Sequence, residues 1–166
     1  LDPATLDNRP EWYHISRGDE MMSSPLISAV STYKALAHPA RMRILAMLRG
    51  GELCVCQLIA VVRLAPSTIS AHLVELKRAG LVEDRKEGKW VHVRLADNAE
   101  TRGVLAGIFA TLADDPQVNS DHKVLERLRR VELAVLTRAG MDLERVGITG
   151  CCPPSSAKGT RPCPSA

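Results

Sequence analysis

The fold of this chain is decided by residues 53–95, which read LCVCQLIAVVRLAPSTISAHLVELKRAGLVEDRKEGKWVHVRL. Two cysteines at positions i and i+2, Cys54 and Cys56, open this stretch, and an apolar run follows them. Apolar runs of this length, bounded by turn residues, are typical of short buried elements. We predict a short helix over 54–62.

A second helix is predicted directly after it. Pro66 suits the first helical turn, because its missing N–H would be unsatisfied there and its φ is preset. Apolar residues then recur at helical spacing up to Gly80, which ends the helix. The helices 54–62 and 66–79, joined by the turn 63–65, form a helix-turn-helix candidate.

Two β-prone segments follow this helix pair. Residues 81–85 and 90–95 alternate in polarity, and residues 86–89 between them form a charged turn that contains Gly88. A hairpin directly after a helix-turn-helix is the wing of a winged helix. We therefore predict a mainly α fold with a small β-hairpin, a winged helix-turn-helix.

Further helices are predicted on both sides of this stretch, at about 26–37, 40–48 and 100–113. The winged-helix domain then spans 26–113. Only 3% of the residues are aromatic, so its core is built from Leu, Val, Ile and Ala, a composition that favours packed helices over a β-sandwich.

The two ends of the chain are expected to lie outside this domain. Residues 1–25 show no helical or strand period and are predicted to be a disordered or added tail, and residues 147–166 are rich in proline and cysteine. A C-terminal helix is predicted within 120–140, from about 121 to 139. It carries a narrow apolar seam, formed by Val124, Leu128, Val131 and Val135. This seam either packs on its own domain or forms a dimer contact, and we favour the dimer contact.

Charge and composition limit the function. The net charge is +3, and residues 63–94 alone carry seven basic and four acidic side chains, so positive charge gathers where DNA would be read. No apolar run of about 18 residues predicts a membrane span, and no signal peptide is recognisable, which predicts a cytoplasmic protein. Five cysteines in that compartment indicate metal binding or redox sensing rather than disulfides.

Four segments in order resemble the ArsR/SmtB family of metal-sensing repressors. They are LAHPARMRIL (36–45), ELCVC (52–56), STISAHL (67–73) and RKEGKWVH (85–92). The resemblance covers roughly residues 26–112, and ELCVC is similar to the arsenite and cadmium/lead sensors. It implies a homodimer that binds double-stranded operator DNA, needs no constitutive cofactor and no membrane, and releases the DNA when its ligand binds. Arsenite sensors of the best-known type have a third cysteine where this chain has Ile59, and the paired Asp/His ligands of zinc sensors are missing.

The ligand is expected to bind at Cys54 and Cys56. Soft thiolates select arsenite, antimonite, cadmium or lead over hard cations, and we favour arsenite or antimonite, with cadmium or lead as the alternative. Cysteines at i and i+2 do not share a helix face, so binding should distort the first helical turn, while the helix N-terminus should favour thiolates. Cys151 or Cys152 is expected to supply the third ligand; alternatively the tail cysteines, including Cys163, are spare.

DNA contacts are predicted from the second helix and the wing. The candidates are Ser67, Thr68, Ser70, His72, Lys77, Arg85, Lys86 and Lys89. His72 could instead be a packing residue, and the wing cations could belong to a solvated turn. Trp90 is expected in the core of the wing.

Three other functions stay open at this point. A repressor of the same fold could respond to oxidation of its thiols instead of an ion. A thiol oxidoreductase or arsenate reductase would need an anion-binding loop around a nucleophilic cysteine, and none is recognisable, so we predict that the chain is not an enzyme. A scaffold protein would use helix 121–139 for a protein partner.

Overall fold

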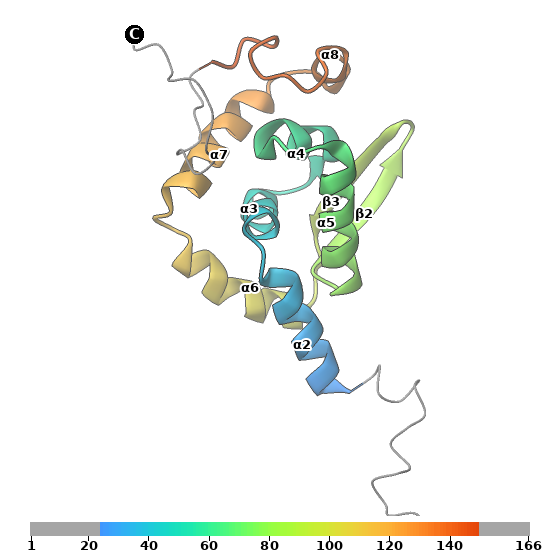
Figure 1. Cartoon of the computed structure of the whole chain (residues 1–166), viewed down its shortest axis with the longest axis vertical. Helices are drawn as coiled ribbons and strands as arrows, with labels where there is room; N and C mark the ends of the chain where they lie inside the picture. Colours follow the sequence, from blue (N-terminus) through green and yellow to red (C-terminus); the bar gives the residue numbers. More distant parts are fainter. Residues whose placement is uncertain (1–23, 150–166) are drawn as a thin grey trace, which may run out of the picture.

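The computed structural model of this chain describes residues 24–149 (Figure 1). Its elements are α2 (Pro25–Leu36), α3 (Pro39–Leu48), β1 (Leu53–Cys54), α4 (Val55–Val62), α5 (Pro66–Arg78), β2 (Val82–Glu87), β3 (Trp90–Leu95), α6 (Ala99–Thr111), α7 (Pro116–Leu128) and α8 (Leu133–Arg138). The predicted mainly helical fold with a hairpin, a winged helix-turn-helix, is confirmed.

Proline begins several of these helices. It occupies the first helical position of α2, α3, α5 and α7, where no intrahelical N–H bond is lost. The sequence analysis anticipated this for Pro66 but began the C-terminal helix only at about residue 121. Pro116 instead opens α7, because the Asp115 side chain accepts a hydrogen bond from the backbone N–H of Val118 and caps the helix.

Helix α3 lies at the centre of the domain, with the other helices around it (Figure 1). Ile44, Leu45 and Met47 are fully buried, and α3 contacts α2, α4, α5, α7 and β3. The apolar core that it forms holds α4 and α5 in their relative orientation, with a bend of 115° between the two helices. Within the described residues no single helix has the length and hydropathy of a membrane span; α4 and α5 reach them only as this bent pair.

The sheet has three antiparallel strands in the order β1-β3-β2. Strands β2 and β3 form the wing, which turns at Gly88 and Lys89 between the paired residues Glu87 and Trp90. The turn is two residues shorter than predicted, and Gly88 takes a left-handed φ of 57° there. The two-residue strand β1, which pairs Leu53 with Val93, was not predicted.

The C-terminal helix within 120–140 was predicted as one element, and this was wrong. The chain forms α7 and α8 with a break at 129–132. Both Leu128 and Leu136 are fully buried, with α7 packed on α3 and α4 and α8 packed on α4. The chain bends between them so that both leucines reach the same core. Val124 and Leu128 of the predicted seam are buried within their own chain, whereas Val135 is 41% exposed, so at most the second half of the seam is available for the dimer contact that we favoured.

A buried ion pair holds α7 to α3. The guanidinium of Arg43 donates to both carboxylate oxygens of Asp121, at 2.6 and 2.8 Å, and Gln117 donates to the same carboxylate at 2.9 Å. The side chain of Asp121 is only 4% exposed, so these donors replace the water that the carboxylate lost.

Candidate ligand site and DNA-reading surface

The sulfurs of Cys54 and Cys56 meet at the start of α4. Cys54 is the last residue of β1 and caps the helix in an extended conformation, whereas Cys56 lies within its first turn. The two Sγ atoms are 2.9 Å apart. The sequence analysis expected both residues on the helix and therefore a distorted first turn. No unwinding is needed, because pairing of Cys54 with His92 in the sheet already turns the first sulfur toward the second.

Both thiols are buried, and burial changes their acid–base behaviour. Cys54 is 2% exposed and Cys56 is 8% exposed. Burial, together with the hydrogen bond to Cys54, raises the pKa of the Cys56 thiol to about 12. The expected thiolate at the helix N-terminus is therefore wrong for Cys56. The nearby backbone N–H groups of Cys56 and Gln57 lower its pKa, but they do not offset the loss of water.

The structure brings two of the four predicted ligands together. Within residues 24–149 no group of three His, Cys, Asp or Glu side chains is arranged to hold a metal ion, and Ile59 contributes no donor atom. Cys151 and Cys152, which were predicted as further ligands, lie outside the described residues, as does Cys163. The described part of the site is thus a pair of sulfurs.

A cavity of about 480 Å³ lies over this pair, between the helix α5 and the wing. Its walls are mostly apolar and include Leu73, Val74, Val82, Trp90, Val91 and Val93. Strands β2 and β3 lie beside α5 (Figure 1), so a group that enters the cavity touches both elements that were predicted to read DNA. The sequence analysis missed these lining residues. The signal that it left unused was Val74, an apolar residue 53% exposed on an otherwise polar helix face.

An ion pair joins the two sides of this cavity, and a cation–π contact lies on its wing side. Lys77 of α5 pairs with Asp84 of β2, and the ammonium of Lys89 lies 4.9 Å from the ring centre of Trp90, a cation–π contact. Trp90 is half-buried against the core, as expected. Lys77, which was predicted to bind phosphate, is held against the wing in this state.

The outer face of α5 presents most of the predicted polar contacts. Ser67, Thr68 and Ser70 are exposed, and the Ser70 hydroxyl donates to the carbonyl of Pro66 at 2.9 Å. His72, in contrast, points inward and is only 9% exposed.

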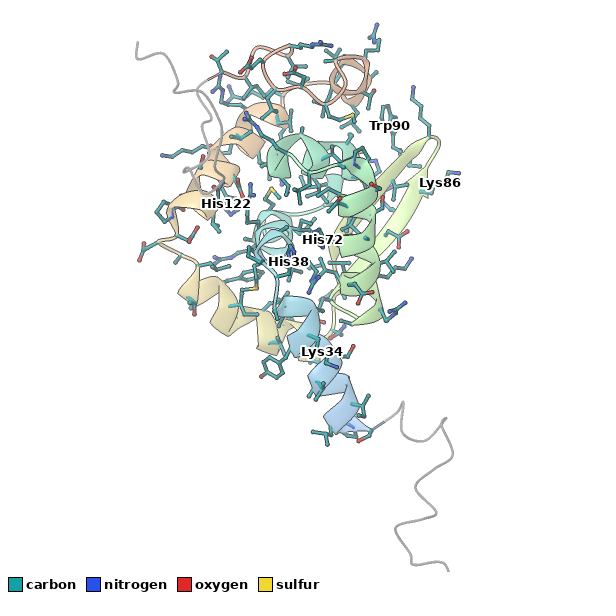
Figure 2. The ribbon with its side chains drawn as sticks, viewed as in Figure 1. Lys34, His38, His72, Lys86, Trp90 and His122 are labelled. Carbon is teal, nitrogen blue, oxygen red and sulfur yellow. The ribbon has the colours of Figure 1, made fainter. Side chains whose placement is uncertain are left out.

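His72 packs on His38, as Figure 2 shows, and the two ring centres are 4.3 Å apart. Burial and the neighbouring His38 and Arg41 lower the pKa of His72. The prediction that His72 contacts DNA is therefore corrected to a packing role, the alternative that the sequence left open.

The wing cations differ in how they are held. Arg85 donates to both carboxylate oxygens of Glu52, at 2.8 and 2.6 Å, and to Glu87 at 2.6 Å. Arg85 thereby lowers the pKa of both carboxyl groups. Arg85 thus pairs with two carboxylates and links the wing to the loop before β1. Its side chain is 53% exposed, and its contact with phosphate stays a prediction. Lys86, at the exposed edge of the wing (Figure 2), forms no ion pair with the described residues.

Comparison with known proteins agrees with this architecture. The family described as bacterial regulatory protein, arsR family, matches residues 38–84. An uncharacterized HTH-type transcriptional regulator of Methanocaldococcus jannaschii is 41% identical over 71 residues, which are 42% of this chain and 80% of that protein. The structure of HlyU from Vibrio cholerae is 33% identical, with a TM-score of 0.51, over 56% of this chain and all of that one.

Two relatives carry names that mention an element. The arsenic resistance transcriptional regulator ArsR1 of Pseudomonas putida is 40% identical over 77 residues, 46% of this chain and 56% of that protein. A homologue of the cadmium resistance regulatory protein CadC from Staphylococcus aureus is 38% identical over 72 residues, 43% of this chain and 60% of that protein. This chain thus spans little more than half the length of these relatives.

The residues that match the family model, 38–84, contain both helices of the helix-turn-helix, α4 and α5, and the start of the wing strand β2. The match covers 80% of the Methanocaldococcus jannaschii protein and all of the HlyU chain. The chain belongs to the arsR family of bacterial regulatory proteins, whose members are DNA-binding regulators and not enzymes.

Proposed function

We propose that this protein is a transcriptional repressor that binds operator DNA as a homodimer and releases it when arsenite or antimonite binds Cys54 and Cys56. The observation that carries this proposal is the position of the two sulfurs, 2.9 Å apart beneath the cavity between α5 and the wing. An ion bound there acts directly on the two elements that would hold the DNA.

The mechanism follows from the size of the ion. Two sulfurs bonded at about 2.3 Å each to one pyramidal trivalent arsenic, with an S–As–S angle of roughly 95–100°, lie about 3.5 Å apart, so binding must separate the two sulfurs, now 2.9 Å apart, by roughly 0.5 Å. Cys54 is paired with β3 of the wing, and Cys56 lies on α4, which contacts α5. Separation of the sulfurs therefore moves the wing relative to α5, and the two elements no longer fit one DNA surface together.

The identity of the ion is the finer part of this proposal. Cadmium and lead also prefer sulfur, and they are the alternative ligands. They displace a proton from each thiol that they bind, which the raised pKa of Cys56 opposes. Arsenite and antimonite, as neutral hydroxides, take up the thiol protons when their own oxygens leave as water. This difference favours the metalloids at neutral pH. Cys151 or Cys152 remains our candidate for a third ligand of inorganic arsenite.

The raised pKa of Cys56 also argues against a thiol enzyme. Nucleophilic cysteines work as thiolates with a lowered pKa, and the pKa of Cys56 is raised. A repressor that responds to oxidation is retained as a second candidate, because the short distance between the two sulfurs brings them close to bonding. A regulator of DNA acts where the DNA is, so a cytoplasmic location goes with this proposal.

The decisive experiment is a gel-shift titration on the DNA upstream of the gene that encodes the chain. The wild-type protein is expected to retard this DNA, and arsenite or antimonite to release it. The C54S, C56S variant is expected to retard the DNA equally well and to stay bound in arsenite. C163S is the matched control and should respond like the wild type. Release of the C54S, C56S variant by every inducer would exclude the proposed site, and release of the wild type by peroxide alone would favour the redox candidate.

The wing provides a second expected result. Lys86→Ala, Lys89→Ala should weaken DNA binding and lower the slope of log affinity against log salt by about four units for the dimer, since each protomer loses two phosphate contacts and each contact removes about one unit. Fluorescence anisotropy between 50 and 200 mM salt measures this slope. Lys34→Ala, which removes an exposed lysine of α2, should leave it unchanged. An unchanged slope in the wing variant would mean that its lysines are only solvated.

The dimer contact is expected on α2 instead of the C-terminal seam. Leu26 and Tyr33 are 70% and 67% exposed there, with Ile27 and Val30 beside them, so they form an apolar face that the other residues of 24–149 do not cover. Leu26→Glu should raise the dissociation constant of the dimer by about tenfold or more. Light scattering over a dilution series checks this. Val135→Glu, a substitution in the former seam, is the control and should leave the dimer intact.

A further inference from the structure

The cavity over the cysteine pair is larger than an ion needs. It measures about 480 Å³, within the range of about 300–1,000 Å³ that is typical of small-molecule sites. A bare metalloid or metal ion would leave almost all of this volume empty. The wall is apolar around the sulfurs, and its charged residues, Lys77, Asp84 and Lys89, are exposed to solvent. A ligand with an apolar part is therefore a better match than an ion alone.

The number of sulfur donors at the site also favours a ligand with an organic group. Trivalent arsenic forms three bonds, and the described residues offer two sulfurs and no third ligand. An arsenical that already carries one As–C bond needs only these two sulfurs, whereas inorganic arsenite needs a third ligand from outside residues 24–149 or keeps a hydroxyl group. A hydroxyl group placed against valine and leucine side chains loses its water without gaining a hydrogen bond, whereas a carbon substituent gains free energy from the burial of its surface.

We propose that the preferred ligand is a monosubstituted trivalent arsenical, R–As(OH)₂, whose arsenic bonds to the Sγ atoms of Cys54 and Cys56 while its organic group R fills the cavity. This inference rests on the proposed function, since it specifies the ligand of the same site. Each thiol forms an S–As bond as one As–OH bond breaks. The two thiol protons leave with the two hydroxyl oxygens as water, and arsenic stays trivalent.

This chemistry suits buried thiols. The condensation consumes thiols and releases water, so no net proton is lost and no free thiolate has to persist in the buried site. Both cysteines are buried, at 2% and 8% exposure, so a ligand that condenses with neutral thiols matches this site.

The organic group also strengthens the link to DNA. Leu73 and Val74 line the cavity from α5, and Val82 and Val91 line it from the wing. A group that fills the cavity contacts both elements and fixes the spacing between them at that of the ligand-bound state. A bulky arsenical is therefore expected to release DNA at lower occupancy than inorganic arsenite.

The test compares two probes, phenylarsenous acid and sodium arsenite. It uses the full chain carrying C151S, C152S and C163S, so that Cys54 and Cys56 are the only thiols. Calorimetric titration is expected to give an affinity for phenylarsenous acid that is higher by about tenfold or more, which is about 1.4 kcal/mol. Mass spectrometry should find one added phenylarsenic group and the loss of two waters, and nothing on the additional C54S, C56S variant.

Variants of the wall separate the cavity from the sulfurs. Val74→Phe on α5 and Val91→Phe on β3, both at partly exposed positions, fill the cavity from opposite sides. Each should remove most of the preference for phenylarsenous acid and leave arsenite binding unchanged. Val135→Phe, at a position of similar exposure on α8 that does not line the cavity, should change neither.

The outcomes distinguish this inference from the proposed function. Equal affinity for the two probes, or a preference that survives both cavity-filling variants, overturns the inference and leaves a thiophilic switch in place. If neither arsenical binds to the cysteine pair, both the inference and the proposed function are overturned.

Discussion

Replacing Asp121 by alanine is expected to lower the free energy of unfolding by about 3 kcal/mol. The carboxylate is buried and accepts hydrogen bonds from Arg43 and Gln117. Its removal leaves the Arg43 guanidinium, whose side chain is only 22% exposed, without a counter-charge between α3 and α7. Urea unfolding followed by circular dichroism measures the effect. With an m value of about 2 kcal/mol/M, the midpoint should fall by roughly 1.5 M.

Glu83→Ala is the matched control for this variant. Glu83 accepts two hydrogen bonds from Arg94, at 3.1 and 2.7 Å, so the same two chemical groups meet in the wing. Both side chains are at least half exposed there, and we expect a loss of less than about 1 kcal/mol. If the two variants lose equal stability, burial of the Asp121 pair is not what holds α7 in place.

The affinity for cadmium is expected to rise by about 100-fold or more between pH 6 and pH 8, while that for arsenite stays flat; the proton of Cys56 alone accounts for about 100-fold. Burial raises the pKa of Cys56 to about 12, so this thiol is protonated over the whole range. A cadmium ion that binds its sulfur must displace the proton, which strengthens binding about tenfold for each pH unit and each proton released. Arsenite loses hydroxyl groups as water and releases no net proton.

Calorimetry in two buffers of different ionisation enthalpy measures the proton release directly. The variant with C151S, C152S and C163S restricts the signal to Cys54 and Cys56, and the experiment is repeated at pH 6, 7 and 8. A cadmium affinity that does not change with pH would show that Cys56 is ionised before the metal binds, contrary to its burial at 8% exposure.

Elements governed by near neighbours in the sequence were predicted well. The bounds of α3, α4 and α5 agree with the prediction to within one or two residues, since an initial proline and the apolar spacing act within a few residues of each other. The C-terminal region was predicted less well. The seam from Val124 to Val135 has the period of one continuous helix, yet the need to bury both Leu128 and Leu136 bends the chain. That requirement depends on α3 and α4, which the periodicity does not reveal.

The candidate site was likewise predicted only in part. The residues with suitable chemistry were recognisable from the sequence, but their burial and their interaction partners were not. Arg85 is engaged by Glu52, 33 residues away, and His72 turns toward His38, which belongs to another element. The cavity is lined by residues of α5 and of the wing, so its shape cannot be deduced from any single segment of the sequence.

The amino-acid sequence by itself determined the helix-turn-helix, the wing and the presence of two closely spaced thiols, because these follow from local backbone preferences and from the order of the residues. The tertiary structure alone decided that the sulfurs meet without unwinding a helix, that burial keeps Cys56 protonated, and that an apolar cavity separates α5 from the wing. The physical reason is that burial, pKa and cavity shape depend on side chains far apart in the chain, which become neighbours only when the core has packed.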